Sequence, residues 1–227
     1  MHDIAANLEM VRKRIIVAEQ RFRRQPGSVR LLAVSKTRSE AEIRAALACD
    51  QLDFGENYLQ EAAAKMSALS EPRISWHFIG PIQANKSRAI AEKFDWVHSI
   101  DRIKIARRLN DMRPDGLPDL NVCIELNIDN EPSKSGILPV QLYDFAREFQ
   151  AFPRLRLRGL MAMPKASNDF EQQRDAFQRL NQCYTQLKSA NYPLDTLSMG
   201  TTNDMEAAIA EGSTMVRIGT AIFGPRT

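Results

Sequence analysis

The sequence has 227 residues, 44% of them hydrophobic and 26% charged, and its 31 Lys and Arg against 28 Asp and Glu give a formal net charge of +3. This composition is typical of a globular protein with one large core, and the small net charge does not favour a nucleic-acid partner. No run of about 18 apolar residues predicts a membrane-spanning helix, and the first residues lack the apolar core of a secretory signal. We therefore expect a cytoplasmic protein without a membrane partner. The three cysteines are too widely spaced for a metal or disulfide motif.

The first predicted element is an amphipathic helix over residues 3–24. Its apolar residues recur at three- and four-residue steps, with charged residues between them. Pro26-Gly27 ends the helix, and a strand over residues 30–35 follows it. This strand is apolar from Leu31 to Val34 and leads directly to Lys36.

Strands and helices alternate along the rest of the chain. After the strand at 30–35, further strands are expected at 52–54, 74–79, 95–100, 121–127, 156–162, 196–199 and 214–218. A helix of about ten residues is expected from Ser39, which is a good N-cap. Further helices are expected at 58–69, 84–93, 102–112, 139–150, 168–190 and 204–211.

Eight strand-helix repeats with mostly short connections predict parallel strands joined by right-handed crossovers. We therefore expect an α/β fold, a single (β/α)8 TIM barrel formed by one domain over residues 1–227. Only nine residues follow the eighth predicted strand, so the helix at 3–24 is expected to take the place of the last barrel helix. A doubly wound open sheet is the alternative.

A ligand site is expected where the strands end, since barrels of this kind carry their sites at the carboxyl ends of the strands. Lys36 is the amine that abuts its strand, and an ammonium against an apolar strand has a lowered pKa suited to Schiff-base formation. A lysine that reaches out to solvent from the strand end is the plain alternative. Lys86, Lys134 and Lys165 also lie beyond strand ends and compete for the role.

Anion binding is expected near the last two strands. The segment Ser198-Met-Gly-Thr-Thr-Asn-Asp204 offers free amides and hydroxyls before a helix, although a plain N-cap uses the same groups. Strand alternation points Arg217 into the barrel mouth, where it needs an acceptor on a ligand or on a carboxylate. Gly219 lets a ligand approach the backbone, whereas His77 fits a packed core histidine. The histidines are too far apart for a zinc motif, so no metal is expected.

Several motifs in one order resemble the pyridoxal phosphate homeostasis proteins, formerly called proline synthetase co-transcribed homologues. They are Ala33-Val-Ser-Lys-Thr37, Phe54-Gly-Glu-Asn-Tyr58, Trp76-His-Phe-Ile-Gly-Pro-Ile-Gln83, Ser133-Lys-Ser-Gly-Ile137, Arg158-Gly-Leu-Met-Ala162, Ser198-Met-Gly200 with Asp204, and Val216-Arg-Ile-Gly-Thr-Ala-Ile-Phe-Gly224. The resemblance runs from about residue 3 to residue 226.

The resemblance implies an alanine-racemase-like barrel, PLP fold type III, that binds pyridoxal 5'-phosphate (PLP). It implies that Lys36 forms the Schiff base and that Arg217 faces the pyridine nitrogen. It places the remaining cofactor-binding positions at Asn57, His77, Met199, Gly200, Thr202, Gly219 and Thr220. The family usually reads Met-Ser where this chain has Thr201-Thr202; Thr202 keeps a hydroxyl, so phosphate binding is expected to survive.

The resemblance favours a role in vitamin B6 homeostasis, with PLP held rather than used in catalysis. A permanently charged arginine beside the pyridine nitrogen disfavours its protonation, which makes the ring a poor electron sink. A small PLP-dependent amino-acid racemase or decarboxylase is the alternative, and a cofactor-free Schiff-base aldolase is a third hypothesis. The partners implied are PLP and apo PLP-dependent enzymes, and the chain is expected to be a monomer.

Overall fold

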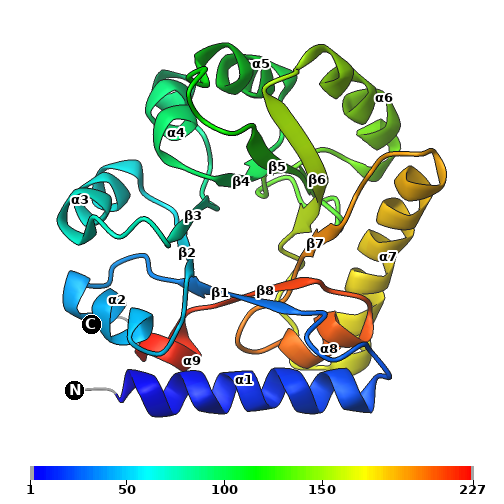
Figure 1. Cartoon of the computed structure of the whole chain (residues 1–227). Coiled ribbons are helices and arrows are strands. Elements are labelled where there is room, and N and C mark those ends of the chain that lie inside the picture. Colours follow the sequence, from blue (N-terminus) through cyan, green and yellow to red (C-terminus); the bar gives the residue numbers. More distant parts are fainter. Residues whose placement is uncertain (1–2, 226–227) are drawn as a thin grey trace.

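The computed structural model describes residues 3–225 and contains a closed barrel of parallel strands (Figure 1). The strands are β1 Arg30–Val34, β2 Asp53–Glu56, β3 Ser75–Phe78, β4 Trp96–Ile100, β5 Leu120–Leu126, β6 Leu155–Ala162, β7 Thr196–Ser198 and β8 Met215–Ile218. They pair in chain order, and β8 returns to β1 to close the barrel. The expected TIM barrel is confirmed, and the open-sheet alternative is wrong.

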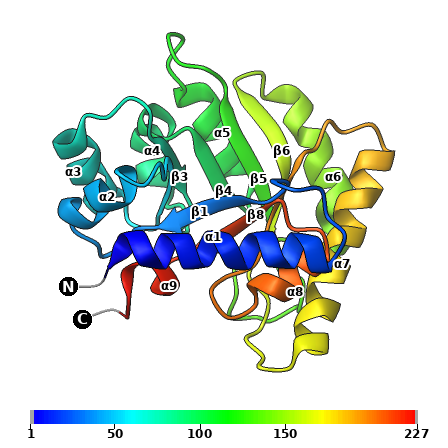
Figure 2. The same ribbon diagram turned by 60° about the horizontal axis from the view of Figure 1, so that its bottom comes forward.

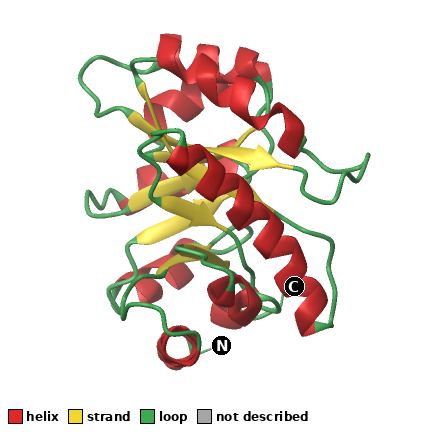
Figure 3. Ribbon diagram, turned by 90° about the vertical axis from the view of Figure 1, so that its right-hand side faces the viewer, coloured by secondary structure: helices red, strands yellow, loops and turns green. Residues whose placement is uncertain are grey.

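Helices surround the strands (Figure 3). The α-helices are α1 Ile4–Arg21, α2 Glu40–Leu47, α3 Leu59–Leu69, α4 Ser87–Lys93, α5 Ile103–Met112, α6 Leu142–Arg147, α7 Phe170–Ser189, α8 Met205–Ala210 and α9 Thr220–Phe223. Short 3-10 segments are η1 Ala84–Lys86, η2 Pro139–Gln141 and η3 Glu148–Ala151. The region expected as one helix over 139–150 is thus three consecutive segments, and α9 was not predicted.

Local sequence explains where α1 and α2 begin. The carboxylate of Asp3 accepts from the amide of Ala6, while Ser39 and Glu42 form a capping box before α2. No helix within residues 3–225 is both long and apolar enough to cross a membrane.

Helix α1 occupies the place of the last barrel helix, as expected. It lies along β1 and β8 and packs against α2, α8 and α9 (Figure 2). Two arginines connect this region to the C-terminal part of the chain: Arg14 of α1 pairs with Glu206 of α8, and Arg24, just after α1, donates to the carbonyl groups of Ile209 and Ser213. The N-terminal helix is therefore part of the barrel layer.

Two neighbouring isoleucines of α1 allow a matched test of this packing. Ile15 is buried, whereas the side chain of Ile16 is 52% exposed. We expect Ile15→Ala to lower the free energy of unfolding by about 2 kcal/mol, the lower end for such a change, because Ile15 also borders a cavity. Ile16→Ala should have little effect in the same urea titration. Equal losses for the two variants would mean that α1 does not pack as described.

Candidate functional site

A cavity of about 340 Å³ lies at the carboxyl ends of the strands, where a barrel site is expected. Its wall combines the ends of β1, β2, β3, β6, β7 and β8. The lining residues are Val34, Lys36, Arg38, Asn57, Ile79, Met163, Thr201, Thr202, Asn203, Arg217, Gly219 and Thr220. Six of the residues singled out from the sequence are thereby brought together: Lys36, Asn57, Thr202, Arg217, Gly219 and Thr220.

Three other candidates lie outside this lining. Met199 is fully buried, and His77 is fully buried inside the barrel. Gly200 has a φ of +96°, and a Cβ atom there would stand 2.6 Å from the Cβ of Ala208. Glycine is thus required at 200 to shape the loop after β7.

The backbone on both sides of Lys36 is held by contacts with β2 and α3. The amide of Ser35 donates to Gly55 at 3.0 Å, and its carbonyl accepts from the Nζ of Lys65 at 2.6 Å. The amide of Thr37 donates to Glu61 at 2.5 Å. Thr37 has a φ of +63°, a left-handed conformation that is costly for a β-branched residue. These contacts fix the chain direction at Lys36, whereas the competing lysines 86, 134 and 165 do not line the cavity.

A buried ionic cluster lies behind Lys36, and the sequence analysis missed it. Lys65 contacts Glu56 at 2.7 Å and Glu61 at 2.5 Å, and the hydroxyl of Ser35 donates to Glu56 at 2.5 Å. Burial raises the pKa of Glu56 above its ordinary value, although the adjacent ammonium opposes this shift. The four-residue spacing of Glu61 and Lys65 on one helix was the available signal.

Arg217 is buried at the base of the cavity. Its guanidinium donates to the carbonyl of Ser198, to the hydroxyl of Ser198 at 2.8 Å and to the carbonyl of Ala162 at 3.0 Å. Burial lowers its pKa, while Asp204 and Glu125 oppose that shift from a distance. Arg217 forms no ion pair within residues 3–225, so the carboxylate-paired alternative does not hold. Three hydrogen bonds leave some of its five donors for an acceptor in the cavity.

The loop after β7 and the first residue of α9 contribute hydroxyl groups at the cavity wall. Thr201 is used internally, because its amide and hydroxyl donate to Asp204 at 2.5 and 2.8 Å. The hydroxyls of Thr202 and Thr220 make no hydrogen bond to another described residue and are free to donate. The amide oxygen of Asn57 is buried and has no partner within the described part of the chain.

Several lining residues were not among the expected cofactor-binding positions, although the last two belong to the segment expected to bind an anion: Val34, Arg38, Ile79, Met163, Thr201 and Asn203. Arg38 is the most informative of them. It ties the turn after Lys36 to the end of the chain by donating to the carbonyl groups of Gly224 and Pro225. In the sequence, only its position two residues after Lys36 could have indicated that Arg38 lines the cavity.

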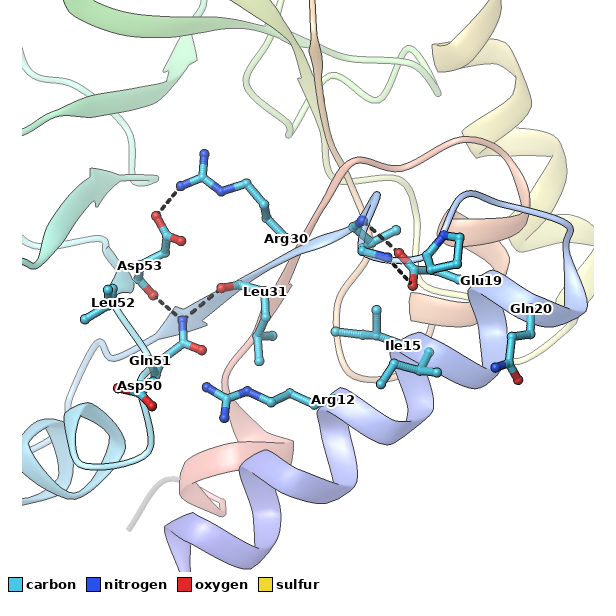
Figure 4. Close-up of a pocket in the computed structure, with 14 residues that line it drawn as sticks. Arg12, Ile15, Glu19, Gln20, Arg30, Leu31, Asp50, Gln51, Leu52 and Asp53 are labelled. Atoms are coloured by element: carbon cyan, nitrogen blue, oxygen red, sulfur yellow. Dashed lines mark hydrogen bonds and ion pairs between the residues drawn. The ribbon is translucent and has the colours of Figure 1, made fainter.

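A second, larger cavity of about 620 Å³ lies at the opposite end of β1 and β2, against α1 (Figure 4). Its wall includes the ion pair of Arg30 with Asp53 and the amide of Gln51, which donates to the carbonyl groups of Leu31 and Asp53. Lys36 and Arg217 do not border it. The larger of the two cavities is therefore not the candidate functional site.

The comparisons with known proteins agree with this geometry. A family model described as "Alanine racemase, N-terminal domain" matches residues 5–227. An alanine racemase from Corynebacterium glutamicum shares the fold, with a TM-score of 0.72 at 16% identity over 97% of this chain and 60% of that one. The fold and site therefore define a barrel of the alanine racemase N-terminal class.

Relatives that align over the whole chain identify the family within this class of barrel. Proteins named "Pyridoxal phosphate homeostasis protein" from Pseudomonas aeruginosa and Escherichia coli are 53% and 51% identical, over all of this chain and 97% and 98% of their own. The chain belongs to the family of pyridoxal phosphate homeostasis proteins. PipY of Synechococcus elongatus, solved with PLP bound, superposes with a TM-score of 0.86 at 32% identity, covering 97% of this chain and all of that one.

Proposed function

We propose that this protein binds PLP as a Schiff base on Lys36 and serves intracellular PLP homeostasis without substantial catalysis. The observation that carries the proposal is one cavity that joins Lys36, Arg217, Thr202 and Thr220 at the carboxyl end of the barrel. The relatives named for PLP homeostasis and the PLP complex of PipY support it. Apo PLP-dependent enzymes are the proposed recipients, and the protein is proposed to be a cytoplasmic monomer with one PLP-binding domain.

The side chains of the cavity fit the chemical groups of PLP. The cofactor supplies an aldehyde that condenses with a primary amine, and Lys36 is the lining lysine. The unused donors of Arg217 suit the pyridine nitrogen, and the free hydroxyls of Thr202 and Thr220 suit a phosphate. The unpartnered amide oxygen of Asn57 accepts a hydrogen bond from a ligand hydroxyl.

The lining also supports holding the cofactor over turning over a substrate. General acid-base catalysis uses a titratable side chain within hydrogen-bond reach of the reacting atoms. The residues that line the cavity include no histidine, tyrosine, cysteine or carboxylate, so Lys36 would have to serve alone. The charge of Arg217 further disfavours a protonated pyridine ring.

Absorption spectroscopy with added PLP tests the proposal. We expect the wild type to develop a visible Schiff-base band that is absent in Lys36→Ala and retained in Lys86→Ala, the matched control. Proton exchange at Cα of alanine in D₂O should not exceed the rate with free PLP. A band that survives Lys36→Ala would refute the attachment site, and rapid exchange would favour a racemase instead.

A further inference from the structure

A continuous series of buried polar contacts crosses the interior of the barrel. The hydroxyl of Ser198, which accepts from Arg217, lies 2.8 Å from Nδ1 of His98. Nε2 of His98 lies 2.9 Å from Nδ1 of His77, and Nε2 of His77 lies 3.0 Å from the carboxylate of Asp53. The series connects β8, β7, β4, β3 and β2, and it spans the barrel between β7 and β4, which are not neighbours.

The carboxylate at one end of the series fixes the position of the proton on His77. Asp53 is ionised, because its contacts with His77 and Arg30 keep the pKa of the carboxyl low against the opposing effect of burial. An ionised carboxylate only accepts, so Nε2 of His77 must carry a proton. Ser75, whose hydroxyl lies 3.1 Å from the same nitrogen, shares this donor.

Both histidines are held neutral. Burial lowers the pKa of His77, with Asp53 and Asp95 opposing and Arg30 adding to the shift. Burial lowers the pKa of His98 further, and His77, Arg217 and Arg30 add to it. A neutral imidazole has one donor and one acceptor, so Nδ1 of His77 accepts from Nε2 of His98. Nδ1 of His98 then accepts from the hydroxyl of Ser198, which itself accepts from Arg217.

We propose that Ser198, His98, His77 and Asp53 are positioning residues that hold Arg217 through one directional chain of hydrogen bonds across the barrel. The chain runs from the donor-only guanidinium at the cofactor cavity to the acceptor-only carboxylate of Asp53, which borders the second cavity (Figure 4). A change in the charge of Asp53 is therefore expected to alter how the hydrogen-bond chain positions the guanidinium of Arg217. This inference rests on the proposed function, in which Arg217 contacts the cofactor.

A second arginine–carboxylate pair beside Trp96 provides a control. The ring of Trp96 contacts two arginines, Arg30 and Arg158, whose guanidinium carbons are 5.8 and 4.7 Å from its centroid. Arg30 pairs with Asp53, and Arg158 pairs with Asp195. Asp195 has no hydrogen bond or ion pair with either histidine, so Asp195→Asn removes a more exposed arginine–carboxylate pair and leaves the hydrogen-bond chain unchanged.

Histidine tautomers in the cofactor-free protein test the chain directly. The sequence holds only three histidines, and His2→Gln leaves the two of interest. Long-range ¹H–¹⁵N NMR at about pH 7.5 should show both as Nε2–H tautomers, and both should titrate below the usual imidazole pKa of about 6.5. Asp53→Asn should remove the single tautomer of both histidines, because an amide side chain can donate as well as accept, whereas Asp195→Asn should leave the tautomers unchanged. An Nδ1–H tautomer of either histidine in the otherwise unaltered chain, or ordinary titration, would overturn the proposal.

The affinity for PLP provides a second test of the hydrogen-bond chain. We expect Asp53→Asn to weaken the affinity for PLP by about threefold to tenfold, a typical range for coupling between distant residues, while Asp195→Asn leaves it unchanged. Equal effects of the two substitutions would contradict the proposal. Because the tautomers are measured without PLP, a protein with the expected tautomers but no Schiff-base band would refute the proposed function and leave the hydrogen-bond chain intact.

Discussion

Lys65→Met is expected to lower the free energy of unfolding by about 3 to 5 kcal/mol near neutral pH, because it breaks a buried ion pair by removing one partner. The ammonium of Lys65 lies 2.7 Å from Glu56, and both side chains are buried. Methionine would fill the space of the lysine stem but leave the carboxylate of Glu56 with the hydroxyl of Ser35 alone. Urea unfolding followed by circular dichroism measures the loss.

The pH dependence of the stability loss and a second substitution test whether the unpaired carboxylate of Glu56 causes that loss. Burial already raises the pKa of Glu56, and without Lys65 the carboxyl should take up a proton more readily, so the loss should shrink at acidic pH. Adding Glu56→Gln to Lys65→Met removes the uncompensated charge and should recover most of the stability. Arg88→Met, which breaks an exposed pair with Glu92, is the control and should change little. A loss that Glu56→Gln does not recover would assign the effect to packing.

The ion cluster also matters for the site. Lys65 donates to the carbonyl of Ser35, and Glu61 accepts from the amide of Thr37, so the two residues hold the backbone on each side of Lys36. Loss of these contacts would let Thr37 leave its left-handed conformation, and the backbone that carries Lys36 at the cavity wall would no longer be held in place. Lys65→Met should therefore also weaken PLP binding at temperatures where the variant is still folded.

The barrel could be predicted because its evidence is local and repeated. Apolar runs such as Leu31–Val34 identify strands, and caps such as Ser39 locate helix starts. Eight such repeats leave few topologies. Helix α9 escaped prediction because one turn after Gly219 has no periodic pattern to detect, and its stability comes from packing against α1.

The site could be predicted only in part, because the strand-pairing register that places side chains inside the barrel has no local sequence signal. Lys36 and Arg217 lie at strand ends, where alternation and chain order suffice to place them at the barrel mouth. The contact of His98 with Ser198 joins residues 100 positions apart on two strands, β4 and β7, that are not neighbours in the barrel. Pairing registers such as His77 with Gly55 and Arg217 with Leu32 fix the depth of each side chain, and no local pattern encodes them.

The stability of this protein is expected to depend on pH through Glu125, a residue of β5. Burial and the nearby charge of Asp101 raise the pKa of its carboxyl to about 7, and Arg217 opposes the shift. A carboxyl in an unfolded chain has a pKa of about 4.3. Between these values the folded protein binds more protons at Glu125 than the unfolded chain does, so this residue makes stability fall as pH rises from about 4.3 to about 7.

Glu125→Gln removes this dependence and should stabilise the protein at alkaline pH. The gain over the wild type should be near zero at about pH 4 and reach on the order of 3 kcal/mol at about pH 8, since one pKa unit corresponds to about 1.4 kcal/mol. Urea titrations of both proteins across this range measure the difference, and Glu148→Gln controls for removing an exposed charge. A gain that is the same at every pH would mean that Glu125 is not the titrating group. Because glutamine keeps the shape and removes only the charge, the same variant also removes a carboxylate that favours the charged form of Arg217 at the cofactor cavity.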